Sequence, residues 1–489
     1  MTARIHGVFR GSNFFSNSRS WGNEHKPEHR VKGFQNAGNE CVMFEGKILP
    51  VTLKLGAPIL ISNLFLVFYF AADTYFISLI DQGSTALLSG TGLIFPILYL
   101  FYATGNGIST GMASLIARGI GKNDLGTIHM AADSGLFLVL FLCCVTLPLG
   151  FLFSNEIMEL LAGKELGMEA LSYGRTYFLY LLPGFGMLLF LYLFFGIFQG
   201  EGDMTPISIA SVIAGVSNII LDPILIFIFG MGVKGAAIAT GISYGLAGLY
   251  AIYVFLKKKS ILSMNFRISN VNGAILLEIV RIGFPESLSM LSLALIYIAL
   301  NTLVSAMGES EMSAWTLCAK TDAFVVMPAY AISAATLTMA GQNYGRKNIG
   351  RIAEIYRLNL ITGMASALLF AGLYSLGAPL LFSCFSSVEA VVAGAVRQAR
   401  IISFSFAGVA AVVISASLFQ ATGRPMPAMI LRVARLIVFI VPSAYLFVKG
   451  LGWGMAGIFA GIVFGNTAIL FISWKWTHVH IRELIKGEA

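Results

Sequence analysis

Long apolar segments fill the chain from residue 53 onward, and short polar stretches separate them. A helix needs about 20 predominantly apolar residues to cross a bilayer, and each segment reaches that length. The pattern therefore predicts an all-α integral membrane protein with 12 transmembrane helices. The expected spans are residues 53–80, 85–112, 129–153, 171–199, 205–229, 235–256, 274–305, 312–340, 354–381, 393–420, 427–448 and 453–475.

Composition agrees with a membrane protein, since 57% of the 489 residues are hydrophobic, only 11% are charged, and the mean hydropathy is +0.81. No ordinary soluble domain has this balance. The formal net charge of +8 resides mostly in the connections between segments. That distribution is typical of membrane topology, and we expect no nucleic-acid partner. The five cysteines have neither metal-ligand nor disulfide spacing.

The polar stretches divide the chain into domains. Residues 1–50 lack the apolar core of a signal peptide, so we expect a disordered tail, and one hypothesis is that translation begins at Met43. Residues 51–256 form the expected N-lobe, 274–476 the C-lobe and 477–489 a cytoplasmic tail. The linker between the lobes is placed at 257–273, which contains Lys257, Lys258, Lys259 and Arg267.

Basic residues also predict the orientation. With a cytoplasmic N-terminus, the outer connections hold few of them, whereas the cytoplasmic connections hold many. The positive-inside rule then places both termini in the cytoplasm of a multi-pass plasma-membrane protein. The basic residues assigned to the cytoplasmic side, besides the linker, are Arg118, Lys122, Arg281, Arg346, Lys347, Arg351, Arg357, Arg424, Arg432, Arg435, Lys475, Arg482 and Lys486.

The two halves of the chain resemble each other. FQGEGDMTP at 198–206 matches FQATGRPMP at 419–427, and GMGVKGAAIATGISYG at 230–245 matches GLGWGMAGIFAGIVFG at 450–465. Six helices per half is an even number, so both halves have the same orientation in the membrane. We therefore expect two six-helix lobes related by a parallel pseudo-two-fold repeat, with a transport path between them.

Polar side chains inside the apolar segments identify a candidate site. Asn218 and Asp222 are four residues apart and share one helix face. Asp73, Asp222 and Thr240 each lie about eight residues from an outer connection, hence at a similar depth. Because intramembrane carboxylates are costly, these residues are predicted to bind Na⁺ through oxygen ligands or to share a proton. The alternative is that they only hydrogen-bond neighbouring helices.

Three further residues are candidates for other roles. Pro223 follows Asp222 and removes a backbone N–H, which predicts a helix bend beside the carboxylate; the alternative is a tolerated membrane proline. Lys320 and Asp322 lie two apart in the eighth segment, so they cannot face each other. They are candidates for lining the cavity, where Lys320 would oppose cationic substrates unless compensated.

Enzyme motifs do not fit their surroundings. GxSxG occurs at 107–111 and at 241–245, but a nucleophile elbow needs a strand, a turn and a helix. In membrane helices the same small residues favour helix packing. The sequence contains neither GxxxxGK[ST] nor HExxH. We therefore expect a protein that is not an enzyme and has no cofactor.

Several of these motifs together resemble the multidrug and toxic compound extrusion (MATE) family over residues 50–475. They are Asp73-Thr74, FQGEGDMTP, Asn218-xxx-Asp222-Pro223, GVKGAAIAT ending at Thr240, and GQNYGRKN at 341–348. The resemblance implies two lobes in a V and export of organic, often cationic compounds against inward flow of Na⁺ or H⁺. It also implies that Asp73, Asn218, Asp222 and Thr240 form the cation site of the N-lobe. Because helix ten has no carboxylate and helix seven has carboxylates only near its start, at Glu278 and Glu286, a branch relying on the N-lobe site is implied.

The sequence thus predicts a monomeric secondary active antiporter that exports organic, amphipathic cations in exchange for Na⁺ or H⁺. One alternative is a flippase of lipid-linked oligosaccharide, whose cavity should be basic to hold phosphates. Lys320 is the candidate for such a contact. A second alternative, an intramembrane enzyme, lacks a constellation of nucleophile, base or metal ligands.

Overall fold

The fold is helical throughout the parts of the chain that the computed structural model describes, residues 43–80, 85–162, 167–257 and 271–487. Within them, 12 helical spans are long and apolar enough to cross a membrane, so the predicted all-α fold with twelve membrane helices is confirmed. Most of the predicted tail and linker, residues 1–42 and 258–270, lies outside the described residues.

Each half contributes six of the spans, and several spans consist of more than one helical element. The elements of the first half are α2 (Ile48–Ser78), α3 (Thr85–Gly92), α4 (Phe95–Lys122), α5 (Leu125–Leu152), α6 (Ser154–Ala162), α7 (Met168–Glu201), α8 (Thr205–Pro223), the π-helix η1 (Ile224–Ile228) and α9 (Val233–Lys257). Those of the second half are α10 (Gly273–Ser305), α11 (Glu309–Thr321), α12 (Ala323–Gly345), α13 (Ile349–Ser383), α14 (Glu389–Ile402), the short η3 (Ser403–Ser405), α15 (Phe406–Ala421), α16 (Pro425–Val433), the π-helix η4 (Ala434–Ile440), α17 (Val441–Tyr445), the π-helix η5 (Leu446–Gly450) and α18 (Gly454–Lys486).

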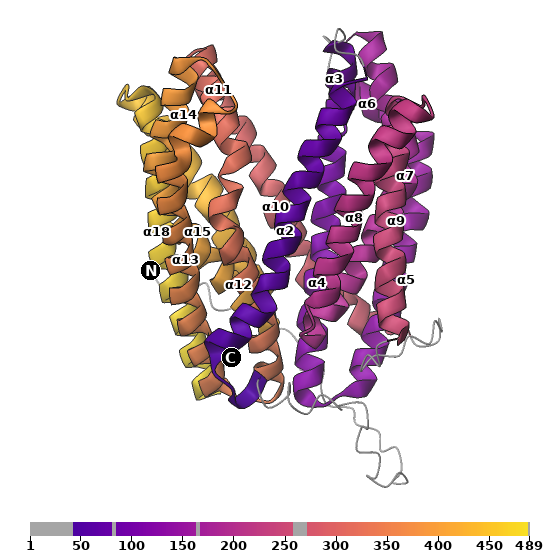
Figure 1. The fold of residues 1–489 in the computed structure, drawn as a ribbon. Coiled ribbons are helices and arrows are strands. Elements are labelled where there is room, and N and C mark those ends of the chain that lie inside the picture. Colours follow the sequence, from indigo (N-terminus) through magenta and orange to yellow (C-terminus); the bar gives the residue numbers. More distant parts are fainter. Residues whose placement is uncertain (1–42, 81–84, 163–166, 258–270, 488–489) are drawn as a thin grey trace.

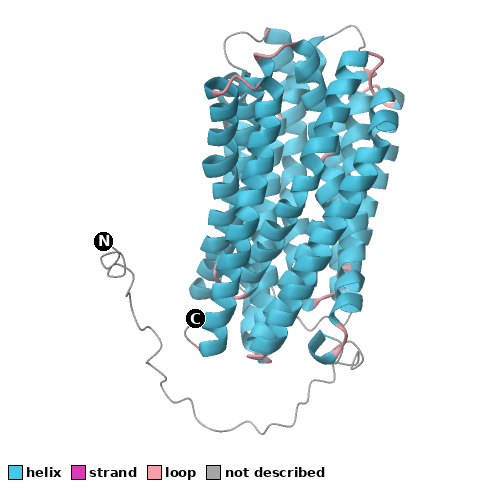
Figure 2. Cartoon of the chain, turned by 90° about the vertical axis from the view of Figure 1, so that its left-hand side faces the viewer, coloured by secondary structure: helices cyan, strands magenta, loops and turns pink. Residues whose placement is uncertain are grey.

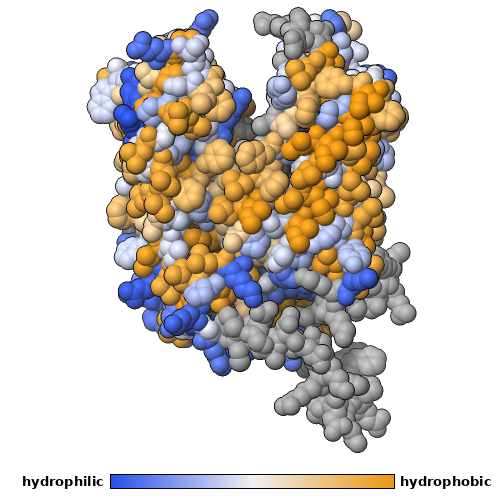
Figure 3. All heavy atoms as spheres, viewed as in Figure 1, coloured by the Kyte–Doolittle hydropathy of each residue, from blue (hydrophilic) through white to orange (hydrophobic). Residues whose placement is uncertain are grey.

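The two halves form the arms of a V (Figure 1). The arms are apart at the top, where α3 and α6 end one arm and α11 and α14 end the other. Side chains leave this space open in its upper part, as the notch in Figure 3 shows. A view turned by 90° shows helices running the height of the molecule, with short loops and the C-terminal end at the bottom (Figure 2). The two predicted lobes are therefore present.

The first helix of each half crosses toward the other half at the closed end. The lower part of α2 packs against α12 and α13, and α10 packs along α4. Thr52 Oγ1 of α2 donates a hydrogen bond to Asn359 Oδ1 of α13 at 2.7 Å, and both side chains are buried. Arg118 of α4 forms an ion pair with Glu278 of α10 at 2.8 Å. These contacts join the two halves below the notch.

Small residues allow α4 and α10 to approach closely. A side chain added at Gly283 of α10 would collide with the backbone of Gly107 in α4. Gly107 begins the first GxSxG motif, so this motif serves helix packing, as small residues commonly do in membranes.

Both ends of the described chain contain helix beyond the predicted lobes. Before α2, Phe44 is buried and its ring lies 3.3 Å from the guanidinium carbon of Arg346. At the other end α18 continues to Lys486, although a tail was expected from residue 477. His480 Nε2 of this extension lies 3.0 Å from Thr422 Oγ1, and its ring stacks on Phe419. Each end thus makes a contact with an aromatic ring.

Candidate cation site

The centre of the site is one face of α8. Asn218 and Asp222 are four residues apart on this helix, and both side chains are fully buried. Asn218 Nδ2 donates to Asp222 Oδ1 at 3.3 Å and to Thr240 Oγ1 of α9 at 3.2 Å. The structure therefore brings together three of the residues that the sequence singled out.

Asp73 of α2 and Tyr177 of α7 complete the cluster. The Tyr177 hydroxyl lies near the side chains of both Asp73 and Thr240. The carboxylates of Asp73 and Asp222 lie close enough to interact electrostatically. Four helices thus contribute to one buried site, which we call the cation cluster: Asp73, Tyr177, Asn218, Asp222 and Thr240.

The sequence did not reveal Tyr177, because a tyrosine in an apolar segment is ordinary. A buried phenol hydroxyl nevertheless needs a hydrogen-bond partner. Other tyrosines continue from the cluster in the same way. Tyr244 of α9 is hydrogen-bonded to Tyr69 of α2 at 3.2 Å and to Tyr102 of α4 at 2.6 Å. This chain of hydroxyls connects three helices of the first arm.

Three oxygens of the cation cluster have no hydrogen-bond donor among the described residues: Asp73 Oδ1, Asn218 Oδ1 and Asp222 Oδ2. Leaving a buried acceptor unsatisfied costs about 1–3 kcal/mol, and more when it is charged. Carboxylate, amide and hydroxyl oxygens are ligands of hard cations, and protons would satisfy the same carboxylates. The donor set therefore fits Na⁺ or protons.

The helix that carries Asp222 changes its winding directly after this residue. Pro223 has no N–H, so the carbonyl of Ile219 lacks its α-helical donor. The chain continues as the π-helix η1, in which Phe229 N donates to Ile224 O at 2.9 Å. π-Helical turns occur frequently at functional sites. Beside the carboxylate the structure thus has a wider helical turn, and a role of Pro223 in coupling stays a prediction.

The second half builds the corresponding helices without these carboxylates. Asp222 aligns with Pro442 or Ser443, and Ser443 Oγ donates to backbone carbonyls, including Gly461 O at 3.2 Å. Asp73 aligns with Asn301, whose Oδ1 accepts from Trp315 Nε1 at 2.8 Å. Neutral hydrogen bonds therefore suffice to hold this fold, which argues that the charges of the first half serve a function.

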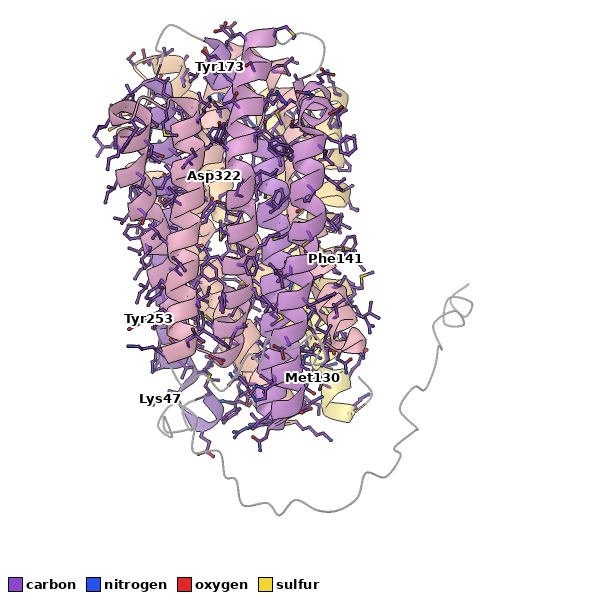
Figure 4. All side chains as sticks on the ribbon, turned by 90° about the vertical axis from the view of Figure 1, so that its right-hand side faces the viewer. Lys47, Met130, Phe141, Tyr173, Tyr253 and Asp322 are labelled. Atoms are coloured by element: carbon purple, nitrogen blue, oxygen red, sulfur yellow. The ribbon has the colours of Figure 1, made fainter. Side chains whose placement is uncertain are left out.

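Lys320 and Asp322 lie in the other arm, apart from the cation cluster. Lys320 is exposed near the end of α11, and Asp322 occupies the break between α11 and α12 (Figure 4). Asp322 Oδ1 accepts a hydrogen bond from Tyr374 of α13 at 3.2 Å. The same tyrosine hydroxyl lies 2.6 Å from Thr321 Oγ1. These residues thus form a second polar group, in the C-lobe.

Substitution of Lys320 tests whether it faces the transported compound. If it does, Lys320→Ala should change which compounds are exported, because it removes a fixed charge from a site of low dielectric constant. Export assays with a panel of cationic and neutral dyes would measure this change. A normally expressed variant with the wild-type substrate profile would contradict the role.

Arg432 and Arg435 were counted among the basic residues of the cytoplasmic side, although the expected span 427–448 contains both. The structure places them within the membrane span Pro425–Gly450. Arg432 of α16 forms an ion pair with Glu286 of α10, whose second oxygen accepts from Gln420 Nε2 at 2.5 Å. Arg435, in η4, donates to Asn466 Oδ1 of α18 at 3.2 Å. The three-residue spacing of the arginines within an apolar run was the signal for one helix face.

Comparisons with known proteins agree with this architecture. The MatE family model matches residues 58–224 and residues 285–446, once in each half. The multidrug export protein MepA of Staphylococcus haemolyticus (strain JCSC1435) is 25% identical over 437 residues, covering 88% of this chain and 93% of MepA. An outward-facing multidrug resistance MATE family transporter of the MOP superfamily superposes with a TM-score of 0.86 at 26% identity, covering 93% of this chain and 99% of that one. The MATE transporter ClbM in complex with Rb⁺ superposes with a TM-score of 0.79 at 28% identity, covering 91% and 99%.

Proposed function

Because the chain belongs to the MatE family, whose model matches more than half of it, we propose that it is a secondary active antiporter that exports organic compounds in exchange for Na⁺ or H⁺. The observation that carries the proposal is the cation cluster, in which three buried oxygens lack donors among the described residues. The multidrug export function of MepA supports drug export, and the Rb⁺ complex of ClbM supports a monovalent cation. Organic, amphipathic cations remain the predicted substrates.

The cation cluster would couple the two fluxes through its charge. Two ionised carboxylates in a membrane interior are unfavourable, so the emptied cluster favours uptake of a cation or a proton. A bound ion shifts the equilibrium between conformations only if it binds one of them more tightly. Asp73 and Asp222 come from different helices, so closure around an ion draws α2 and α8 together. The wider turn at η1 is the element that we propose to change shape.

The proposal includes an orientation in which the open end of the V faces outward. Both termini are then cytoplasmic, in a plasma-membrane protein that works as a monomer. The supporting observation is the positive-inside distribution, with Arg346, Lys347 and Arg351 near the closed end.

Cysteine labelling tests this orientation. In a variant lacking the five native cysteines, a cysteine placed in the 257–273 loop should react with a membrane-impermeant maleimide only after the membrane is opened. A cysteine at Gly230, in the turn between η1 and α9, serves as the matched control. It should be labelled on intact cells. The reverse pattern would invert the proposed topology.

Efflux from proteoliposomes tests the function itself. Purified protein should export a fluorescent organic cation when either a Na⁺ or a proton gradient is imposed separately. The gradient that drives efflux identifies the coupling ion. Efflux that neither gradient accelerates would overturn the antiporter proposal. The flippase alternative has weaker support, since the relative MepA is a multidrug export protein.

A further inference from the structure

We propose that Arg435 binds an anionic group of the exported compound, namely a carboxylate, sulfonate or phosphate. The proposal rests on the export function and adds a chemical requirement to its substrates. Organic acids and zwitterions would then be exported together with, or in preference to, simple cations. The residues that carry the inference are Arg435, its neighbour Arg432 and the tyrosines around them.

The charges around Arg435 do not balance. Arg432 is paired with Glu286, whose second oxygen is occupied by Gln420. Arg435 has no ion pair with any carboxylate of the described residues, and its Nε has no partner among them. The local group of two arginines and one glutamate thus retains one positive charge. Ionised side chains in membrane spans commonly act as counter-ions of ligands.

Arg435 has donors available for a ligand. A guanidinium presents five N–H groups, and Arg435 uses one of them for Asn466 Oδ1. Asn466 is in turn fixed by its own bond to Ser405 Oγ at 2.9 Å. The side chain is therefore held from one side by a neutral partner. The planar fork suits bidentate binding of a carboxylate or phosphate.

Aromatic side chains from both halves of the chain lie near Arg435. Its charge interacts with Tyr297 of α10 and Tyr330 of α12, which are 44% and 41% exposed. Tyr99 of α4, in the other half, is within electrostatic range of both tyrosines. Tyrosines from three helices and both halves thus lie near one another beside Arg435, and two of them are partly exposed. Phenol rings there can contact an apolar body, and their hydroxyls can donate to an anion.

The winding of the helix is a second indication of a functional site. Arg435 lies in the seven-residue π-helix η4, and Asp222 is followed, after Pro223, by the π-helix η1. Each half therefore combines an intramembrane charge that lacks an ion-pair partner in the described chain with a π-helical turn. In the first half the charge is negative and fits a cation, and in the second half it is positive.

Asp322 does not neutralise Arg435 in the described structure. Both residues interact electrostatically with Tyr297, but Asp322 is hydrogen-bonded to Tyr374, and no ion pair joins it to the arginine. A compound with both an acid and an amine would therefore meet both charges in the second half. This accommodates organic cations that also carry an acidic group.

The test measures binding of two dyes that differ only at one acid group. Rhodamine 110 has a free carboxylate, and rhodamine 123 is its methyl ester. Fluorescence anisotropy with detergent-purified full-length protein should give a lower Kd for rhodamine 110. Arg435→Gln should raise the Kd of rhodamine 110 by about tenfold or more, because one hydrogen bond between charged groups is lost. It should raise the Kd of the ester by less than about twofold. Arg435→Lys should recover part of the acid preference, because it keeps the charge.

Arg424→Gln is the matched control, since Arg424 lies at the start of α16 and pairs with Glu483. It should leave both Kd values unchanged. The wild-type protein alone can overturn the proposal. It does so if it binds rhodamine 123 as tightly as rhodamine 110, or if it does not bind rhodamine 110. An unchanged ratio in Arg435→Gln would also overturn it. Because binding needs no gradient, this failure is distinct from a failure of antiport.

Discussion

Asp222→Asn should abolish gradient-driven export while leaving the abundance of the protein near the wild-type level. Asparagine keeps the size and one acceptor of the aspartate, so the bond from Asn218 Nδ2 can persist. It cannot ionise, and one of the cluster's two carboxylates is lost. An intramembrane charge without an ion-pair partner is costly, so its removal should not destabilise the fold. Efflux from proteoliposomes, normalised to the amount of protein inserted, would measure the effect.

Ser443→Ala is the matched control, because Ser443 is one of the two residues that align with Asp222 in the second half. Among the described residues its hydroxyl bonds only to backbone carbonyls, so its loss should leave export within about twofold of wild type. Asp73→Asn should behave like Asp222→Asn. If Asp222→Asn, inserted at the normal level, still transports against a gradient at the wild-type rate, the cation cluster is not the coupling site.

Local patterns in the sequence predicted much of this molecule. Helix spans depend on the length of apolar runs, because the bilayer sets that length, and the twelve spans followed from it. The internal repeat predicted two lobes. Asn218 and Asp222 meet on α8 because four residues complete about one helical turn, and a turn of the chain brings Thr240 back beside them.

Contacts between distant segments were not predictable in this way. Tyr177 of α7 lies near both Asp73 and Thr240, and no spacing in the sequence relates these three residues. The crossing of α2 and α10 at the closed end depends on helix packing, which a repeat does not specify. The sequence counted Arg432 among the basic residues of the cytoplasmic side and could not reveal its partner, because Glu286 lies on a different helix.

Arg432→Met should destabilise the protein severely, by about 3–5 kcal/mol, because it leaves Glu286 as an unpaired carboxylate within a membrane span. The two side chains are only 17% and 15% exposed, so water cannot replace the lost partner. We expect a large fall in Tm. Size-exclusion chromatography of detergent-solubilised protein after heating would measure it. The effect contrasts with Asp222→Asn, since here the removed charge compensates another.

A double substitution separates the cost of the unpaired charge from the loss of packing. In Glu286→Gln/Arg432→Met the carboxylate is neutralised as well, and the glutamine can still accept from Gln420 Nε2. Replacing both members of a buried ion pair is often close to neutral, so most of the lost stability should return. If the double variant is as unstable as Arg432→Met, then the contacts of the arginine side chain, and not its charge, stabilise α16 against α10.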